Sequence, residues 1–532
     1  MFSAQRIPYQ QTGAFTKIVL DYLEGAATLS PFYEEHPTID GIKELIARKQ
    51  KQSIDRPLLV ATLNEQYKEL VVDEKVNSNI TLLAKETTFT VCTAHQPNLF
   101  TGPLYFIYKI LHAIKLAGEL KKQLPEYDFV PVYYMGSEDA DLAELNHFTV
   151  EGKKYEWATS QTGAVGRMLV DNSLLSLLAT LEGQLSIYPY GKEWIDTLRN
   201  CFKEGNTIQQ ATLKLVHSLF SSYGLIVLIA DQPLLKISMK QVFEDDLFLH
   251  APSQIVSNTG GKLSEHYNEQ AHARDINLFY LQNSIRERIE SSGDKFIVHN
   301  TDIVFTASEL KEELSVHPER FSPNVILRGL YQESILPNIA FIGGGGEIAY
   351  WLQLKDLFKH FNVPFPVLVL RNSFLVLEKS WQQKIEKLGL TLETIFQPNE
   401  VILNSLVKQH SVHDLALNGK LESASALYDS IYDQAQNIDP TLAQHVAAIK
   451  KQALHRLQEL EKKMLRAEKR KFNEQKLKIE TIKNKLFPKN SLQERVDNIG
   501  YYYSRWGHEF IEALYEHSLG LEQEFTVLTE NN

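Results

Sequence analysis

Four apolar runs of strand length limit what this chain can fold into more than any other feature of its sequence. They occupy residues 89–94, 128–136, 224–231 and 364–371. Runs rich in Val and Ile, with no alternation of apolar and polar residues, are typical of a parallel sheet covered on both faces. Residues 104–122 lie between the first two runs and have the pattern of an amphipathic helix of crossover length. The sequence therefore predicts an α/β fold with a doubly wound parallel sheet.

Two segments interrupt this alternation of strands and helices. Residues 145–170 have the pattern of a hairpin, with Glu151 and Gly152 at its turn. Residues 245–325 are more polar and show little alternation, which indicates a second insertion. We expect a core domain over residues 1–380, with insertions at about 145–220 and 245–325.

A different pattern begins after residue 378. No Gly or Pro occurs from 446 to 486, and apolar residues recur there at heptad spacing with one stutter. This spacing predicts a long helix that pairs with another helix; a solvated helix packed on its own domain is the alternative. We expect an α-helical domain over residues 381–532, with a coiled coil at about 441–487.

Charge is distributed unevenly along the chain. The 55 Lys and Arg residues against 66 Asp and Glu give a net charge of −11, which argues against general nucleic-acid binding. Residues 441–490 nevertheless carry 14 basic and only 5 acidic side chains. This basic segment leaves an alternative function open, namely a nucleotidyltransferase or aminoacyl-tRNA-synthetase-like enzyme that acts on RNA through a basic arm.

Composition also bears on the compartment. No apolar run approaches the ~20 residues that span a bilayer, and the first 17 residues lack the continuous apolar segment of a secretory signal. The two cysteines, Cys92 and Cys201, provide neither a disulfide framework nor zinc-binding spacing. We therefore expect a cytoplasmic protein with no membrane partner, and we assign no metal ligands.

Polar residues follow the first predicted strand and lead into the next helix, at the edge where open α/β sheets bind ligands. Thr101 could cap that helix, and Gly102 would allow a close approach of the backbone to a ligand. His95 could take a catalytic role or be an ordinary loop histidine. The candidate ligand residues of this loop are His95, Gln96, Asn98, Thr101, Gly102 and Tyr105.

An acidic cluster follows the second predicted strand. Its four carboxylates, Glu138, Asp139, Asp141 and Glu144, lie within seven residues, and His147 comes shortly after them. Such a cluster can bind an ammonium group or Mg²⁺, or it can shift the pKa of one carboxyl group toward that of a base. The alternative is that these acids only complement a helix dipole.

Four consecutive glycines, residues 343–346, follow a further apolar segment and open a helical pattern. Glycine permits positive φ angles, and the free N–H groups of a following helix favour a bound anion. A flexible turn is the alternative. Arg328 and Arg371 could hold anionic groups through two hydrogen bonds each. The candidate residues of this third site are Gly343, Gly344, Gly345, Gly346, Glu347, Tyr350 and Arg371.

These motifs, in this order, resemble the bacillithiol biosynthesis cysteine-adding enzyme family, BshC. The resemblance covers nearly the whole chain. It rests on HQPNLFTGPLYFIYKI at 95–110, VPVYYMGSEDADLAELNH at 130–147, LRGLYQESILPNIAFIGGGGEIAYWLQLK at 327–355 and LQERVDN at 492–498. It implies a Rossmann-like core with two connecting insertions and a C-terminal coiled coil that forms a homodimer. It also implies the last step of bacillithiol synthesis, in which the carboxyl group of L-cysteine is joined to the amine of glucosaminyl-malate.

The resemblance further implies how the site is used. The core is similar to class I aminoacyl-tRNA synthetases, so ATP, with Mg²⁺, would place its phosphates near residues 95–102. Asp139, Asp141 and His95 are the expected catalytic residues. Glu138, Asp139 and Asp141 would hold an ammonium group, and one of them could deprotonate the attacking amine. Ala140 stands where the family commonly has a histidine, so no role of that histidine is transferred. A second nucleotide pocket could lie at the aromatic and basic cluster of residues 501–506.

Overall fold

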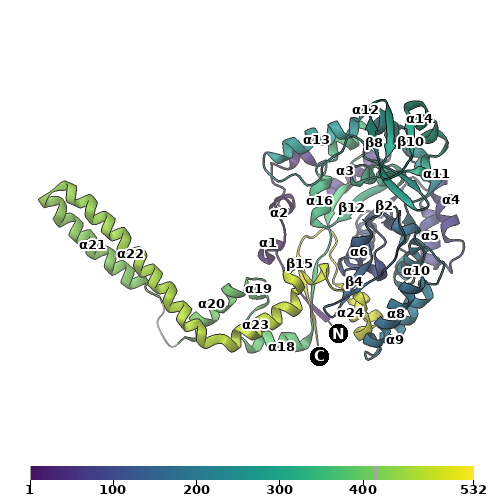
Figure 1. The fold of residues 1–532 in the computed structure, drawn as a ribbon. Helices are drawn as coiled ribbons and strands as arrows, with labels where there is room; N and C mark the ends of the chain where they lie inside the picture. The colour runs from purple at the N-terminus through teal and green to yellow at the C-terminus, as the bar shows by residue number, and fades with distance from the viewer. Residues whose placement is uncertain (1, 412–415, 532) are drawn as a thin grey trace. The chain divides into compact units, whose positions relative to one another are not determined.

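The computed structural model of the chain describes residues 2–411 and 416–531 (Figure 1). Residues 1, 412–415 and 532, which fall within the predicted domains, lie outside this described part. The chain divides into two compact units. Among the described residues, the first comprises 2–10, 14–376 and 491–531, and the second comprises 11–13, 377–411 and 416–490.

A five-stranded parallel sheet forms the centre of the first unit. The four predicted runs form four of its strands, and the apolar segment before the glycine run forms the fifth. The predicted α/β fold is therefore confirmed. All residues of the five strands are buried except at the end of β2 and at the start of β3. In spatial order the strands are β13 (Val367–Leu370), β12 (Asn338–Gly343), β2 (Thr88–His95), β3 (Asp128–Met135) and β6 (Ile226–Ile229).

Helices cover this sheet. The helix predicted at 104–122 is α6 (Tyr105–Gln123), which connects β2 to β3. It packs with α3 (Ile39–Lys49) against β2, β12 and β13 in one apolar cluster that includes Ile42, Val91 and Leu116. The other helices of the N-terminal segment and of the sheet connections are α1 (Tyr9–Thr12), α2 (Lys17–Leu23), α4 (Arg56–Tyr67), α5 (Glu74–Leu82), α11 (Pro233–Lys236), α15 (Val325–Ile335), α16 (Gly345–Trp351) and α17 (Lys355–His360).

Both predicted interruptions are present. The first begins with the hairpin β4 (His147–Val150) and β5 (Lys153–Glu156), and the turn residues Glu151 and Gly152 both have positive φ. It continues through α8 (Asn172–Leu185), α9 (Gly191–Cys201) and α10 (Ile208–Phe220). The second is an antiparallel sheet with flanking helices, which explains its lack of βα alternation. Its elements are α12 (Lys240–Leu249), α13 (Ala251–Ser264), β7 (Leu278–Gln282), β8 (Ile285–Ser292), β9 (Lys295–Val298), β10 (Val304–Thr306), α14 (Ala307–Val316) and β11 (Phe321–Pro323).

Residues 491–531 pack with the first unit in this structure, although they fall within the helical domain expected at 381–532. The reason is strand pairing, because β15 (Phe525–Glu530) lies antiparallel to β1 (Phe2–Ile7) and next to β14 (Phe374–Leu377). Before it come α24 (Ile499–Trp506) and α25 (His508–Glu516). The aromatic side chains of α24 are buried against α9 and α25, so the cluster considered as a second nucleotide pocket packs into the core.

The second unit is helical, and its long predicted helix pairs with another helix of the same chain. The hairpin consists of α21 (Asn418–Ile438) and α22 (Pro440–Lys469), which contact each other extensively (Figure 1). A 3₁₀ turn at Arg470–Phe472 separates α22 from α23 (Asn473–Leu486), so the segment from 446 to 486 is two helices rather than one. The shorter helices are α18 (Lys379–Lys387), α19 (Leu392–Ile395) and α20 (Asn399–His410). In the described part of the chain, no helix is both long and apolar enough to cross a membrane.

A fully buried histidine ties three segments of the first unit together. His112 on α6 donates from Nε2 to the Gly520 carbonyl oxygen at 2.6 Å and accepts the Asn372 N–H at Nδ1, at 3.1 Å. Asn372 lies two residues after the end of β13, and its side chain bonds to both backbone groups of Leu519. Burial lowers the pKa of His112 to about 4, because a charged imidazole there would lose its hydration.

Stability should therefore depend on pH through His112. A histidine whose pKa is lower in the folded than in the unfolded protein stabilises the fold fully above pH ~6.5, and this contribution is lost as pH falls toward 4. The loss amounts to about 3 kcal/mol between pH 7 and pH 4. We predict that His112→Gln has a lower thermal unfolding midpoint than the wild type at pH 7, and that the gap narrows on acidification. A gap that stays constant from pH 7 to pH 4.5 would contradict the assignment.

Candidate functional site

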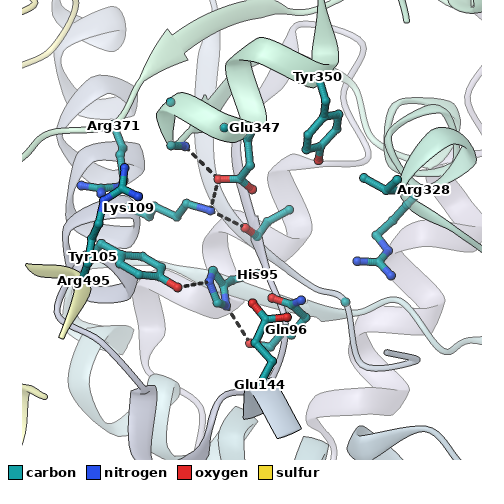
Figure 2. A pocket seen from close by; sticks show the side chains of 16 residues that line it. His95, Gln96, Tyr105, Lys109, Glu144, Arg328, Glu347, Tyr350, Arg371 and Arg495 are labelled. Carbon is teal, nitrogen blue, oxygen red and sulfur yellow. Dashed lines mark hydrogen bonds and ion pairs between the residues drawn. The ribbon is translucent and has the colours of Figure 1, made fainter. Parts of the chain in front are cut away.

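A pocket of about 490 Å³ opens at the carboxyl ends of β2, β12 and β13 (Figure 2). This is where the chain direction across the sheet reverses, because β3 follows β2 on one side and β12 lies on the other. Ligands bind at such switch points in open α/β sheets. The pocket is lined by Ala94, His95, Gln96, Tyr105, Lys109, Gly136, Glu144, Val325, Arg328, Gly344, Gly345, Gly346, Glu347, Tyr350, Arg371 and Arg495.

The glycine run lines the pocket, but not in the way that the sequence suggests. None of its four glycines has a positive φ. The Gly344 N–H donates to Oε2 of Glu347 at 2.8 Å, so a carboxylate of the chain itself caps the start of α16. The anion that we expected at this helix start is therefore already supplied by the protein.

Lys109 on α6 completes this arrangement. Its ammonium group donates to the Ala94 carbonyl oxygen at 2.9 Å and forms an ion pair with Glu347 (Figure 2). The side chain is almost fully buried, and burial lowers the pKa of Lys109. The Lys109–Glu347 pair thus joins the first loop, at the end of β2, to the glycine run.

His95 is neutral in this environment. Its Nδ1 lies 3.1 Å from the Gln96 carbonyl oxygen, so Nδ1 carries the proton, and Nε2 accepts from the Tyr105 hydroxyl at 3.3 Å. Burial, together with the charge of Lys109, lowers the pKa of His95 to about 4. At neutral pH the imidazole can accept a hydrogen bond or a proton, but it has no proton to donate from Nε2.

Two of the predicted acids are committed to other side chains. Glu138 is buried in an ion pair with Lys236 and accepts from the Ser322 hydroxyl at 2.8 Å. Asp139 accepts from Gln96 at 3.2 Å and from Arg328 at 3.3 Å, with Arg286 at 3.9 Å. The two guanidinium groups outweigh the effect of burial and lower the pKa of Asp139 to about 2. Asp139 is therefore a fixed anion that orients Gln96 and Arg328, and it is a weak base.

The remaining acids of that cluster differ in position. Asp141 caps the short helix α7 (Leu142–Leu145) by accepting the Glu144 N–H at 3.2 Å. His147 begins β4 and bonds to the Ala143 carbonyl oxygen, away from the residues that line the pocket. Glu144 is the member of the cluster that faces the pocket. Within the described residues, no group of three or more His, Cys, Asp or Glu side chains is placed to hold a metal ion.

Residues 98–102 form a buried turn beneath the pocket. Phe100, Thr101 and Gly102 all have positive φ, and the Asn498 side-chain amide donates to the carbonyl oxygens of Phe100 and Gly102. Asn98 packs where a Cβ on Gly102 would lie. None of Asn98, Thr101 and Gly102 lines the pocket, and the helix cap predicted at Thr101 is wrong, because α6 starts after Leu104.

A distant segment supplies residues that the sequence did not assign to the site. Glu494 is fully buried and accepts from Arg371 at 2.7 Å and from the Phe374 N–H at 3.1 Å. The amide of Gln493 bonds to both backbone groups of Val376. These contacts anchor the segment and place Arg495 on the pocket wall. The LQERVDN motif was visible in the sequence, but nothing local connected it to residues 371–376, more than one hundred residues earlier.

Two family models match the chain. The N-terminal Rossmann-like domain of bacillithiol biosynthesis BshC matches residues 2–372, and the C-terminal coiled-coil domain of the same family matches residues 374–530. This chain belongs to the BshC family. The resemblance expected from the sequence motifs is confirmed, as are the Rossmann-like and coiled-coil domains that it implied.

Full-length relatives agree with this assignment. The chain is 40% identical to a protein of Cytophaga hutchinsonii over 94% of each chain, and 39% identical to one of Christiangramia forsetii over 98% of each. Both carry the name "Putative cysteine ligase BshC". A solved structure from Campylobacter jejuni, described as a "putative arginyl t-RNA synthetase", covers 77% of this chain and 93% of its own, with 10% identity. Its TM-score of 0.24 is too low to carry an argument.

The glycine run of this BshC-family protein allows a matched test of the pocket. A Cβ on Gly343 would lie 2.8 Å from the ring of Phe341, which is stacked on Trp351, whereas a Cβ on Gly346 would meet nothing within 4 Å. We predict that Gly343→Ala destabilises the fold by roughly 1–3 kcal/mol through overpacking. Gly346→Ala should leave the thermal unfolding midpoint unchanged or slightly raised, because alanine favours the helix. It should nevertheless weaken ligand binding, because its methyl group enters the pocket. Equal unfolding midpoints for the two variants would contradict this geometry.

Proposed function

We propose that this BshC-family protein joins the carboxyl group of L-cysteine to the amine of glucosaminyl-malate, in the last step of bacillithiol synthesis. The observation that carries the proposal is the match of both BshC domains along almost the entire chain, together with relatives that are named cysteine ligases. A pocket lined by both cationic and anionic side chains, at the sheet's switch point, suits a substrate with charges of both signs. The cytoplasmic location expected from the sequence is part of this proposal.

Amide formation from a free carboxylate requires activation, and we propose ATP as its source. ATP would convert the cysteine carboxyl group into an acyl-adenylate or an acyl phosphate, which the amine then attacks. Of the residues to which the sequence assigned the phosphates, His95 and Gln96 line the pocket, so we place the phosphates there, near Arg328. Mg²⁺ would accompany the nucleotide through its phosphates, as is usual for ATP-dependent enzymes.

The other pocket residues divide by position. Figure 2 shows Arg371, Arg495 and Tyr105 on one side and Arg328 and Tyr350 on the other. We propose that the malyl part of the acceptor lies on the Arg371 side, next to the glycine run. Asp139 would contribute by orienting Gln96 and Arg328 rather than by taking a proton, because two arginines stabilise its charge.

The basic arm gives little support to the alternative of an RNA-directed enzyme. Several of its lysines form ion pairs with acids of the second unit: Lys450 with Asp429, Lys462 with Glu459, Lys471 with Glu468 and Lys478 with Glu474. A lysine that is already paired with a carboxylate neutralises a phosphate less effectively, so it releases fewer of the counterions condensed on a nucleic acid. We therefore retain the expectation that nucleic acid is not a partner.

The first test is product formation. Purified protein incubated with glucosaminyl-malate, cysteine and Mg-ATP should yield bacillithiol by mass spectrometry, and omission of ATP should abolish the product. AMP in the reaction would indicate an adenylate, and ADP would indicate an acyl phosphate. Bacillithiol formed equally without ATP would refute the activation step, and no bacillithiol under either condition would refute the proposed reaction.

We also propose that the helical hairpin mediates homodimer formation. The hairpin exposes large apolar side chains in the single chain, among them Leu427 at 60% and Ile438 at 80% exposure, and such surfaces commonly mark interfaces.

Because α21 and α22 pack on each other, a deletion that removes only α22 would leave α21 without its partner. Replacing residues 420–458, which are symmetrical about Asp439, with a short Gly/Ser linker removes most of α21 together with the first part of α22. We predict a dimer for the wild type and a monomer for this variant by light scattering; a dimer that survives the deletion would place the interface elsewhere.

A further inference from the structure

The charged side chains that line the pocket are mostly neutralised by the protein itself. Lys109 is paired with Glu347, and both belong to the lining. Arg328 is paired with Asp139 at 3.3 Å. Arg371 is paired with the buried Glu494 at 2.7 Å. A ligand that bound any of these groups in full would have to compete with a partner already in place, and separating a buried pair is costly.

Two charges on the pocket wall differ from the others. The side chains of Glu144 and Arg495 form no hydrogen bond or ion pair with any residue in 2–411 or 416–531, and both are exposed. Each is nevertheless held in place by its backbone. Glu144 lies in the short helix capped by Asp141, and Arg495 follows Glu494 and Gln493, whose side chains are anchored to residues 371–376.

We propose that Glu144 and Arg495 recognise the two opposite charges of the acceptor substrate: Glu144 binds its ammonium group and Arg495 binds one of its carboxylates. The inference rests on the proposed function, because glucosaminyl-malate carries one ammonium group and two carboxylates. A substrate with both signs of charge matches a pocket whose two uncommitted charges are one carboxylate and one guanidinium.

The surroundings of each residue favour these assignments. Burial raises the pKa of Glu144, and the nearby charges of Asp139 and Asp141 raise it further, whereas Arg328 lowers it. An ammonium group beside Glu144 would offset this crowding of carboxylates. Figure 2 shows Glu144 next to Gln96 and His95, and Arg495 beside Tyr105 and Arg371. At that second end, Glu494 offsets the charge of Arg371, and Arg495 adds a cation that can hold a carboxylate through two hydrogen bonds.

The test compares binding of three compounds by isothermal titration calorimetry. Glucosaminyl-malate carries both kinds of charge, its N-acetylated form lacks the ammonium group, and methyl glucosaminide lacks the malyl carboxylates. We expect Glu144→Gln to weaken glucosaminyl-malate roughly ten- to a hundredfold while leaving the N-acetylated compound unchanged. We expect Arg495→Gln to weaken both malyl compounds by a similar factor while leaving methyl glucosaminide unchanged.

Controls separate this inference from the proposed function. Glu422→Gln and Arg456→Gln remove exposed charges of the same kinds from the helical hairpin and should alter none of the affinities. A variant that weakens all three compounds alike, or one that leaves glucosaminyl-malate unchanged, would overturn the assignment of that residue while the proposed function stands. Wild-type protein that binds none of the three compounds would overturn the proposed function, and this inference with it.

Discussion

The need to pair buried charges determines how this pocket is built. A lysine as deeply buried as Lys109 cannot remain charged unless a carboxylate and further hydrogen-bond partners replace its lost water. Glu347 and the Ala94 carbonyl oxygen provide them, and Glu347 also accepts the Gly344 N–H. One ion pair therefore joins the end of β2, the start of α16 and the helix α6, which together form the floor of the site.

The same requirement explains why the C-terminal segment returns to the core. Arg371, at the end of β13, is buried and needs an anion, and Glu494 supplies it from more than one hundred residues away. The fully buried His112, with Asn372, ties the neighbouring backbone to residues 519–520. Each interaction brings a distant segment to the carboxyl edge of the sheet, and together they place Arg495 at the pocket. The proposed recognition of a carboxylate by Arg495 thus depends on neighbouring residues that stabilise the fold itself.

Local patterns were sufficient for much of the fold. The apolar runs predicted four strands of the parallel sheet, Glu151 and Gly152 predicted the hairpin turn, and the segment without Gly or Pro predicted a helix that pairs with another. The pocket lies at the carboxyl ends of β2 and β12, the edge at which we expected the polar loops to bind a ligand. The place of residues 491–531 was missed, because the strand β15 pairs with β1 at the opposite end of the sequence.

The site residues were harder to predict, for the same physical reason. The sequence near Glu138 does not show that Lys236 pairs with this carboxylate. Likewise, the sequence near Thr101 does not show that Asn498 bonds to its turn, in which Thr101 has a positive φ. The glycine run predicted an anion site, and the sequence does not show that the Glu347 carboxylate of the same helix accepts the Gly344 N–H. Partners far apart in sequence decide which polar residues are committed to the fold and which remain for a ligand, and no local pattern contains that information.

The most direct measurement is a crystal structure of the protein with glucosaminyl-malate bound. We predict an intact Lys109–Glu347 pair, with the ligand's ammonium group at Glu144 and a malyl carboxylate at Arg495. A ligand that displaces Glu347 from Lys109, or that binds outside the pocket at the carboxyl ends of β2 and β12, would contradict it.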